Sequence, residues 1–188
     1  MSAVLEQAQF ETVNAALFFA YRQHRENYQA SQMNRMAWGP QADGKGLGGL
    51  DGAAVAGMIQ VHVRKLGDEA EAIIRARHVQ RDRICTQCKN GTELTKEFED
   101  AIHDVMEWTN YVISGISNYR FREGVVFRHF GAKVHLGNLR DKCQIPERTA
   151  GDHIQKIKAF LQKKEGAAMH AISVNLREAG IVNDEAGQ

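Results

Sequence analysis

The sequence predicts an all-α protein. Only two of its 188 residues are prolines, and β-branched residues rarely occur in runs, so most segments can continue as helices. Apolar residues recur at helical spacing over several long stretches. Hydrophobic residues make up 43% of the chain, which is enough to bury a core. These observations exclude a disordered chain and favour one helical domain or two small ones.

The first expected element is an amphipathic helix over about residues 4–28, within an N-terminal segment 1–37. Its apolar positions follow the period of a helix and are Val4, Ala8, Val13, Ala16, Leu17, Ala20 and Tyr21. Residues 38–52, WGPQADGKGLGGLDG, contain six glycines and a proline and are predicted to form a linker. They match no Walker pattern and follow no predicted strand, which disfavours a phosphate-binding loop.

A helical pair is expected over residues 53–80, separated at Gly67. Asp51 is the expected cap of its first helix. The apolar positions of that helix lie on one face and are Val55, Met58, Ile59 and Val63. The second helix, in DEAEAIIRARHVQRD, begins acidic and ends basic, as the helix macrodipole favours.

Residues 81–118 contain a CTQCK loop and then a long amphipathic helix with acidic first turns. Cys85 and Cys88 have the C-x-x-C spacing that lets two thiolates bind one tetrahedral zinc, and His78 or His103 could complete the site. One hypothesis is therefore a structural zinc, and the other is a loop with two free thiols. Thioredoxin-like chemistry is disfavoured because no strand is evident before the cysteines.

The composition bounds the environment of the protein. No signal pattern and no run of about 18 apolar residues is present, so we expect a cytoplasmic protein that does not span a membrane. Three cysteines in such a chain favour reduced thiols. The net charge is only +1, but residues 118–165 hold eleven Lys or Arg against five Asp or Glu. The basic charge is therefore concentrated in the C-terminal half.

This basic region, residues 119–180, matches a helix-turn-helix. Leu136, Leu139 and Cys143 would face inward from a first helix over 136–143, and Ile145 would fill the turn. Pro146 would begin the second helix, with Glu147 complementing its positive end. The inner face of that helix would be Ala150, Ile154, Ile157 and Leu161. Residues 181–188 are expected to form a flexible tail.

The outer face of the second helix carries side chains that suit DNA. They are Arg148, Thr149, Asp152, Gln155 and Lys156. Arginine can donate twice to guanine, glutamine can pair with adenine, and lysine neutralises phosphate charge. An ordinary helical protein would also have polar outer faces, but the two helices, the tight turn, the small inward Ala150 and the local basic charge occur together here.

Residues 122–157, REGVVFRHFGAKVHLGNLRDKCQIPERTAGDHIQKI, resemble the C-terminal helix-turn-helix of bacterial sigma factors and of phage regulators built on it. In this resemblance EGVVFRHF is a supporting helix, LGNLRDKC the first motif helix and IPERTAGDHIQKI the recognition helix. Arg140 stands where the family usually has alanine, and Gln144 where it usually has glycine. These departures predict either a looser helix crossing or an Arg140 that leans out to a phosphate.

Upstream, LDGAAVAGMIQVHVRKLGDEAEAIIRARHV resembles a helical pair in phage late-gene antitermination proteins of the Q type, and AWG at 37–39 is similar to a tryptophan-glycine element there. The likeness covers about residues 50–80 and 120–180, with 81–118 as an insertion. It implies a transcription antitermination factor that binds double-stranded DNA near a late promoter and modifies the RNA polymerase holoenzyme of a bacterial host. The acidic residues of 93–107 would be a candidate surface for a basic polymerase patch.

Other functions remain open at this point. The alternative is a helical DNA-binding or assembly protein, such as a small terminase-like subunit or a phage repressor or activator. HDVME places His103 and Glu107 on one helix face but lacks the second histidine of the metalloprotease pattern. No nucleophile elbow or triad-like order is found. We therefore expect binding without catalysis and no required cofactor, and the oligomeric state is not indicated.

Overall fold

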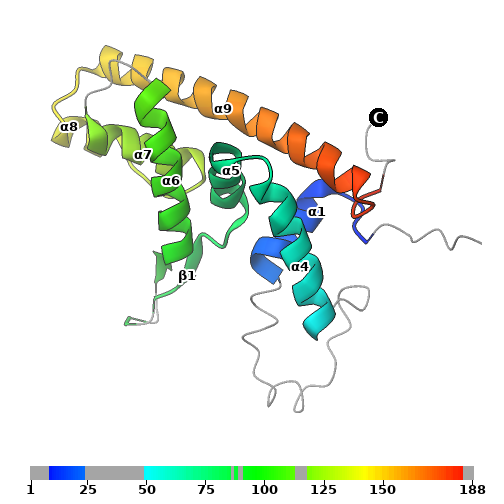
Figure 1. Cartoon of the computed structure of the whole chain (residues 1–188). Coiled ribbons are helices and arrows are strands. Elements are labelled where there is room, and N and C mark those ends of the chain that lie inside the picture. The colour runs from blue at the N-terminus through cyan, green and yellow to red at the C-terminus, as the bar shows by residue number, and fades with distance from the viewer. Residues whose placement is uncertain (1–8, 24–48, 86, 89–90, 113–117, 184–188) are drawn as a thin grey trace, which may run out of the picture. The chain divides into compact units, whose positions relative to one another are not determined.

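The computed structural model describes residues 9–23, 49–85, 87–88, 91–112 and 118–183 (Figure 1). These residues are mostly helical, which confirms the predicted all-α class. None of the helices in the described ranges has an apolar stretch long enough to cross a membrane. The chain divides into two compact units, the first formed by residues 1–67 and 169–188 and the second by residues 68–168.

In the first unit, the beginning and the end of the described chain lie side by side. Phe10 and Val182 form a parallel bridge, and the Phe10 N–H donates to the Ile181 carbonyl at 3.1 Å. The Phe10 carbonyl in turn accepts from the Asn183 N–H. Both Ile181 and Val182 are buried. The prediction that residues 181–188 form a flexible tail is therefore wrong for the first three of them, since they are hydrogen-bonded or buried. The last five lie outside the described residues.

The predicted N-terminal helix is shorter at its start than expected. Helix α1 (Val13–Phe18) begins after Thr12, whose hydroxyl accepts from the Ala15 N–H at 3.1 Å. It continues directly into a π-helical stretch, η1 (Phe19–Gln23). The expected start near residue 4 falls outside the described residues, but residues 9–12 are not helical. A threonine cap thus sets the start that apolar spacing alone missed.

Helix α4 (Gly49–Arg64) begins inside the predicted linker. The prediction that residues 38–52 form a linker is therefore wrong for 49–52, and 38–48 lie outside the described residues. Asp51 lies within the helix and is not its cap. Met58 is 48% exposed and does not share the buried face. The residues of this face that are buried are Val55, Ile59 and Val63.

The first unit has its own small core. Helix α4 packs against η1, and the Gln60 side-chain amide donates to the Ala20 carbonyl at 3.1 Å. Helix α9 (Glu147–Glu178) begins in the second unit and continues into the first, where its last turns contribute apolar residues. The fully buried large side chains of this unit are Leu17, Ile59, Val63, Ile172 and Leu176.

The second unit contains the basic region up to residue 168 and most of the remaining elements. Their bounds are α5 (Asp68–His78), β1 (Asp82–Ile84), β2 (Thr92–Leu94), α6 (Lys96–Val112), α7 (Tyr119–His129), α8 (Leu136–Lys142) and the first part of α9. Helix α5 packs on α6, and α7 contacts both α6 and α8. The largest fully buried side chains here are Ile74, Phe98, Ile102, Met106, Phe121, Ile157 and Leu161.

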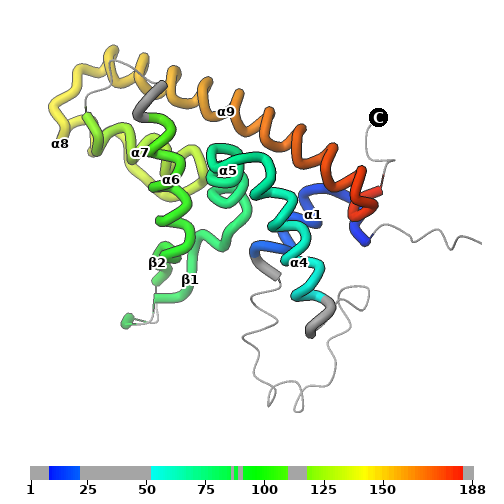
Figure 2. Tube along the Cα trace, in the orientation of Figure 1, coloured from blue at the N-terminus to red at the C-terminus, as the bar shows by residue number. Residues whose placement is uncertain are grey.

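The two cysteines lie at the end of a β-hairpin, which the sequence did not predict. Strands β1 and β2 lie side by side (Figure 2). They are antiparallel with Asp82 opposite Leu94, and the Arg83 guanidinium pairs with the Glu93 carboxylate at 2.8 Å. The inference that no strand precedes the cysteines is therefore wrong. Three-residue strands are too short for a recognisable alternation of polar and apolar residues.

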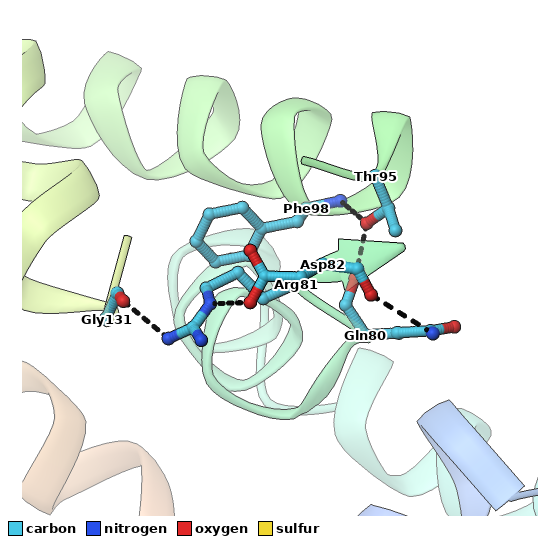
Figure 3. Close-up of polar contacts among 6 residues, drawn as sticks. All are labelled: Gln80, Arg81, Asp82, Thr95, Phe98 and Gly131. Carbon is cyan, nitrogen blue, oxygen red and sulfur yellow. Dashed lines mark hydrogen bonds and ion pairs between the residues drawn. The ribbon is translucent and has the colours of Figure 1, made fainter. Parts of the chain in front are cut away.

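A buried threonine fixes the base of this hairpin (Figure 3). The Thr95 hydroxyl donates to the Gln80 carbonyl and accepts from the Phe98 N–H. The backbone N–H of Thr95 donates to the Arg81 carbonyl at 2.9 Å. The Arg81 guanidinium donates to the carbonyl of Gly131, in the turn after α7. The hairpin is thus attached both to the start of α6 and to α7.

One carboxylate holds α9 to α5 and α7. Glu165 accepts two hydrogen bonds from the Arg77 guanidinium, at 2.5 and 2.7 Å, and lies 3.2 Å from Nε2 of His129. The Arg77 guanidinium also stacks over the Phe130 ring at 5.2 Å. Burial alone would raise the pKa of Glu165, but the hydrogen bonds from His129 and Arg77 and their charge lower this pKa from 4.5 to about 2.

Replacing this carboxylate is expected to destabilise the second unit. Because the folded pKa of Glu165 is depressed, its contribution is fully present above about pH 4.5 and is lost as the pH falls toward 2. Glu165→Gln should lower the free energy of unfolding by about 2–3 kcal/mol at pH 7, measured by urea denaturation. The variant should also lose less stability than the parent protein between pH 5 and pH 2.5. Glu178→Gln, an exposed position on the same helix, is the control; equal effects of the two substitutions would contradict the assignment.

Candidate nucleic-acid interface

In the basic region a tight turn joins α8 to α9, and α7 packs against α8 (Figure 1). The sequence predicted eight inward positions. Four of them are buried, namely Leu136, Ala150, Ile157 and Leu161. The other four are half-buried, namely Leu139, Cys143, Ile145 and Ile154. All eight therefore lie on the inner side, and Cys143 is shielded only in part.

The turn between the two helices is a Schellman motif. The Ile145 N–H donates to the Arg140 carbonyl and the Gln144 N–H to the Asp141 carbonyl, both at 3.1 Å. These bonds satisfy carbonyls that the end of α8 would otherwise leave without partners. The pattern requires a left-handed residue directly after the helix cap, and Gln144 has φ 52°. It is the one non-glycine residue with positive φ among the described residues.

This conformation explains one departure from the sigma-like pattern. A left-handed residue is most easily a glycine, because a Cβ atom crowds the following carbonyl. The chain makes this left-handed turn with Gln144, at a conformational cost.

The start of α9 differs from the prediction by one residue. Pro146 lies just before the helix, which begins at Glu147, and its carbonyl accepts the first helical hydrogen bond from the Ala150 N–H at 2.9 Å. Pro146 therefore occupies the cap position and not the first turn. A proline loses nothing there, since its position needs no N–H donor. Glu147 remains the acidic residue of the first turn.

A close approach of α8 to α7 depends on Gly124, which the sequence analysis did not single out. A Cβ atom at this buried position would lie 2.2 Å from Cδ2 of Leu139 and 3.4 Å from Cγ1 of Val134. Gly124 thus provides the space that Leu139 fills. The available signal was a glycine inside an otherwise helical segment, EGVVF, which lowers helix propensity unless packing requires it.

The proposed base-reading residues all lie on the exposed side of the first turns of α9. They are Arg148, Thr149, Asp152, Gln155 and Lys156. The buried Ala150 and Ile157 occupy the opposite face of the same turns. A helix that is anchored on one side and polar on the other can present these side chains to a groove without rearrangement.

Arg140, the other predicted DNA contact, is paired within the protein. Its guanidinium lies 2.8 Å from the Asp141 carboxylate and 3.7 Å from that of Glu147, and its side chain is 30% exposed. The hydrogen bond that the Arg140 guanidinium donates to Asp141, together with the negative charge of this carboxylate, raises the pKa of Arg140 above its usual value. The side chain therefore leans across the turn toward α9, and both of its partners would compete with a phosphate.

The predicted metal ligands are only partly brought together. Cys85 follows β1 and is half-buried, and Cys88 is exposed. Neither cysteine forms a disulfide in the described residues. His78 is buried in α5, and His103 lies on α6 beside the Phe127 ring. Within the described residues, no three side chains of His, Cys, Asp or Glu form a group that could hold a metal ion, so neither histidine completes a site with the cysteine pair there.

The chain matches no protein-family model, no curated protein and no solved structure.

Relieving the left-handed strain should stabilise the turn. Gln144→Gly is expected to raise the free energy of unfolding by about 0.5–1 kcal/mol, because glycine adopts positive φ without a steric cost. Gln155→Gly, the same change inside α9, should lower it by about 0.5–1 kcal/mol. Urea denaturation of both variants tests this, and destabilisation by Gln144→Gly would contradict the turn geometry.

Adding a methyl group at Gly124 should push α8 away from α7. Gly124→Ala is expected to cost about 1–2 kcal/mol, because the overlap with Leu139 outweighs the better helix propensity of alanine. Gly166→Ala, an exposed glycine on α9 with open space around it, should instead stabilise by about 1 kcal/mol. Combining Gly124→Ala with Leu139→Val should cost less than the sum of the two single changes; strict additivity in thermal or urea unfolding would argue against the contact.

Proposed function

We propose that this chain is a sequence-specific DNA-binding transcription regulator that uses α8, the turn and α9 as a helix-turn-helix. The observation that carries the proposal is the combination of a Schellman turn, a buried Ala150 and an exposed polar stripe on the first turns of α9. In such a motif the second helix enters the major groove, and its N-terminal turns contact base edges.

The more specific role that we propose is that of a phage antitermination factor. The likeness of residues 50–80 and 120–180 to antitermination proteins of the Q type supports it. The protein would bind a DNA element near a late promoter in the bacterial cytoplasm and modify the host RNA polymerase so that it reads through terminators. Transcription with bacterial polymerase through a terminator, with and without the protein, tests this role directly. DNA binding without any read-through would leave a repressor or activator instead.

Helix α6 supplies a candidate polymerase contact in this proposal. Its exposed carboxylates are Glu97, Glu99, Asp100 and Glu107. Asp104 differs from them, because it pairs with Arg75 at 3.0 Å and thus stabilises the packing of α6 on α5. A basic patch on the polymerase would be attracted to these four exposed carboxylates, and the buried opposite side of α6 would hold the helix in place.

Two substitutions on α9 should affect DNA binding differently. Once a preferred sequence has been selected from a random pool, Arg148→Ala should weaken binding to it by about 1–3 kcal/mol and reduce discrimination at one base pair. Lys156→Ala should lower the affinity for all DNA sequences. It should also reduce by about 1 the steepness with which the logarithm of the binding constant falls with the logarithm of the salt concentration. Fluorescence anisotropy over a salt series measures both effects.

Lys96→Ala is the matched control for these substitutions. Lys96 is an exposed lysine at the start of α6, outside the helix-turn-helix. This variant should keep both the affinity and the salt slope of the parent protein to a good approximation. If all three variants bind DNA equally well, α9 is not the recognition helix.

A further inference from the structure

The end of the β-hairpin brings its two cysteines to one side. The Cys88 N–H donates to the Cys85 sulfur at 3.5 Å, so the Cys85 side chain folds back over the turn. The Cys85 N–H donates to the Gly91 carbonyl at 2.8 Å, which closes the hairpin below the cysteines. The Cys88 sulfur lies against this same glycine, since a Cβ atom there would be 3.5 Å away from it. Both thiols are therefore held at the end of the hairpin.

This arrangement supplies half of a tetrahedral thiolate site. Zinc in structural sites takes four ligands, often two C-x-x-C pairs. The described part of the chain adds no third His, Cys, Asp or Glu to the pair. The third cysteine, Cys143, is half-buried at the end of α8 and belongs to the helix-turn-helix. A second hairpin of the same kind would provide the two missing ligands.

The surface next to the cysteines also favours a partner. Ile84, the residue before Cys85, is 70% exposed and is the most exposed of the large hydrophobic residues in the described ranges. Strands β1 and β2 form a sheet of two strands only, so each strand has an outer edge that no described strand covers. Two hairpins that meet end to end would shield both copies of Ile84 from water.

We propose that two copies of this chain share one zinc ion through Cys85 and Cys88 of each copy. Binding converts the four thiols to thiolates, and their four protons pass to the solvent. The Cys88 N–H that points at the Cys85 sulfur complements the negative charge of the bound thiolate. The result is a metal-dependent dimer joined at the hairpins. It does not rest on the proposed DNA binding.

The zinc content and the molar mass of the full-length protein test this proposal together. The reduced protein, loaded with zinc and freed of excess metal, should contain about one ion per two chains and elute as a dimer in light scattering. A chelator should convert it to a metal-free monomer, and zinc should restore the dimer. Substitution of Co²⁺ should give the visible spectrum of a site with four thiolates.

Variants separate this site from other causes of dimerisation. Cys85→Ser and Cys88→Ser should each abolish both zinc binding and the dimer, whereas Cys143→Ser should retain them. Ile84→Ser should keep the zinc ligands but weaken the dimer several-fold, and circular dichroism checks that every variant is folded. A monomer with equimolar zinc, a protein that binds no zinc, or a dimer that survives the loss of Cys85 would each overturn the proposal.

Discussion

The arrangement of the second unit depends on the ion pair and hydrogen bonds of Glu165. This carboxylate joins α9 to Arg77 on α5 and to His129 on α7, and the side chain of His129 is only 8% exposed. Removing the carboxylate would leave the poorly solvated imidazole of His129 and the partly exposed guanidinium of Arg77 without their shared acceptor, which costs more than the loss of the interaction itself. The neighbouring Lys164 adds a second link to α5 through Glu69 at 2.8 Å. Helix α9 is therefore fixed several turns after its first residues, and this N-terminal end needs only the short contacts of α8 for its final orientation.

These contacts explain how α8, a helix of only seven residues, can be stable in the folded protein. Helix α8 is too short to be stable alone. It is held from one side by the fit of Leu139 against Gly124 and from the other by a turn in which two carbonyls of its last residues find donors. Arg140 reinforces the turn by reaching Asp141 and Glu147. At its two departures from the sigma-like sequence pattern, this chain has an ion-paired arginine, Arg140, and a strained glutamine, Gln144.

The sequence predicted this region well because helical spacing and turn chemistry are local. The inner positions of α8 and α9, from Leu136 to Leu161, follow from periodicity, and the outer stripe follows once the inner face is known. The failures have non-local causes. Asp51 was predicted to cap its helix, but the helix begins two residues earlier, at Gly49. Residues 181–183 were predicted to belong to a flexible tail, but this segment forms backbone hydrogen bonds with Phe10, near the other end of the chain. The hairpin is fixed by Thr95 and by an arginine contact to Gly131, and neither contact leaves a pattern in its own segment.

The distribution of charge limits what the proposed interface can recognise. Glu165 is used within the fold, Asp141 and Glu147 pair with Arg140, and Glu123 lies on α7. Of the five acidic residues between 118 and 165, Asp152 is therefore the one placed on the outer stripe of α9. It stands one helical turn from both Arg148 and Lys156. A carboxylate at this point repels phosphate, so the helix cannot lie along a strand with this face against the backbone. It must direct Asp152 to a donor on a base edge, and the cytosine amino group is the major-groove donor that a carboxylate accepts from most directly. Under the proposed function, the same acidic residue that reduces non-specific affinity would therefore contribute to sequence preference.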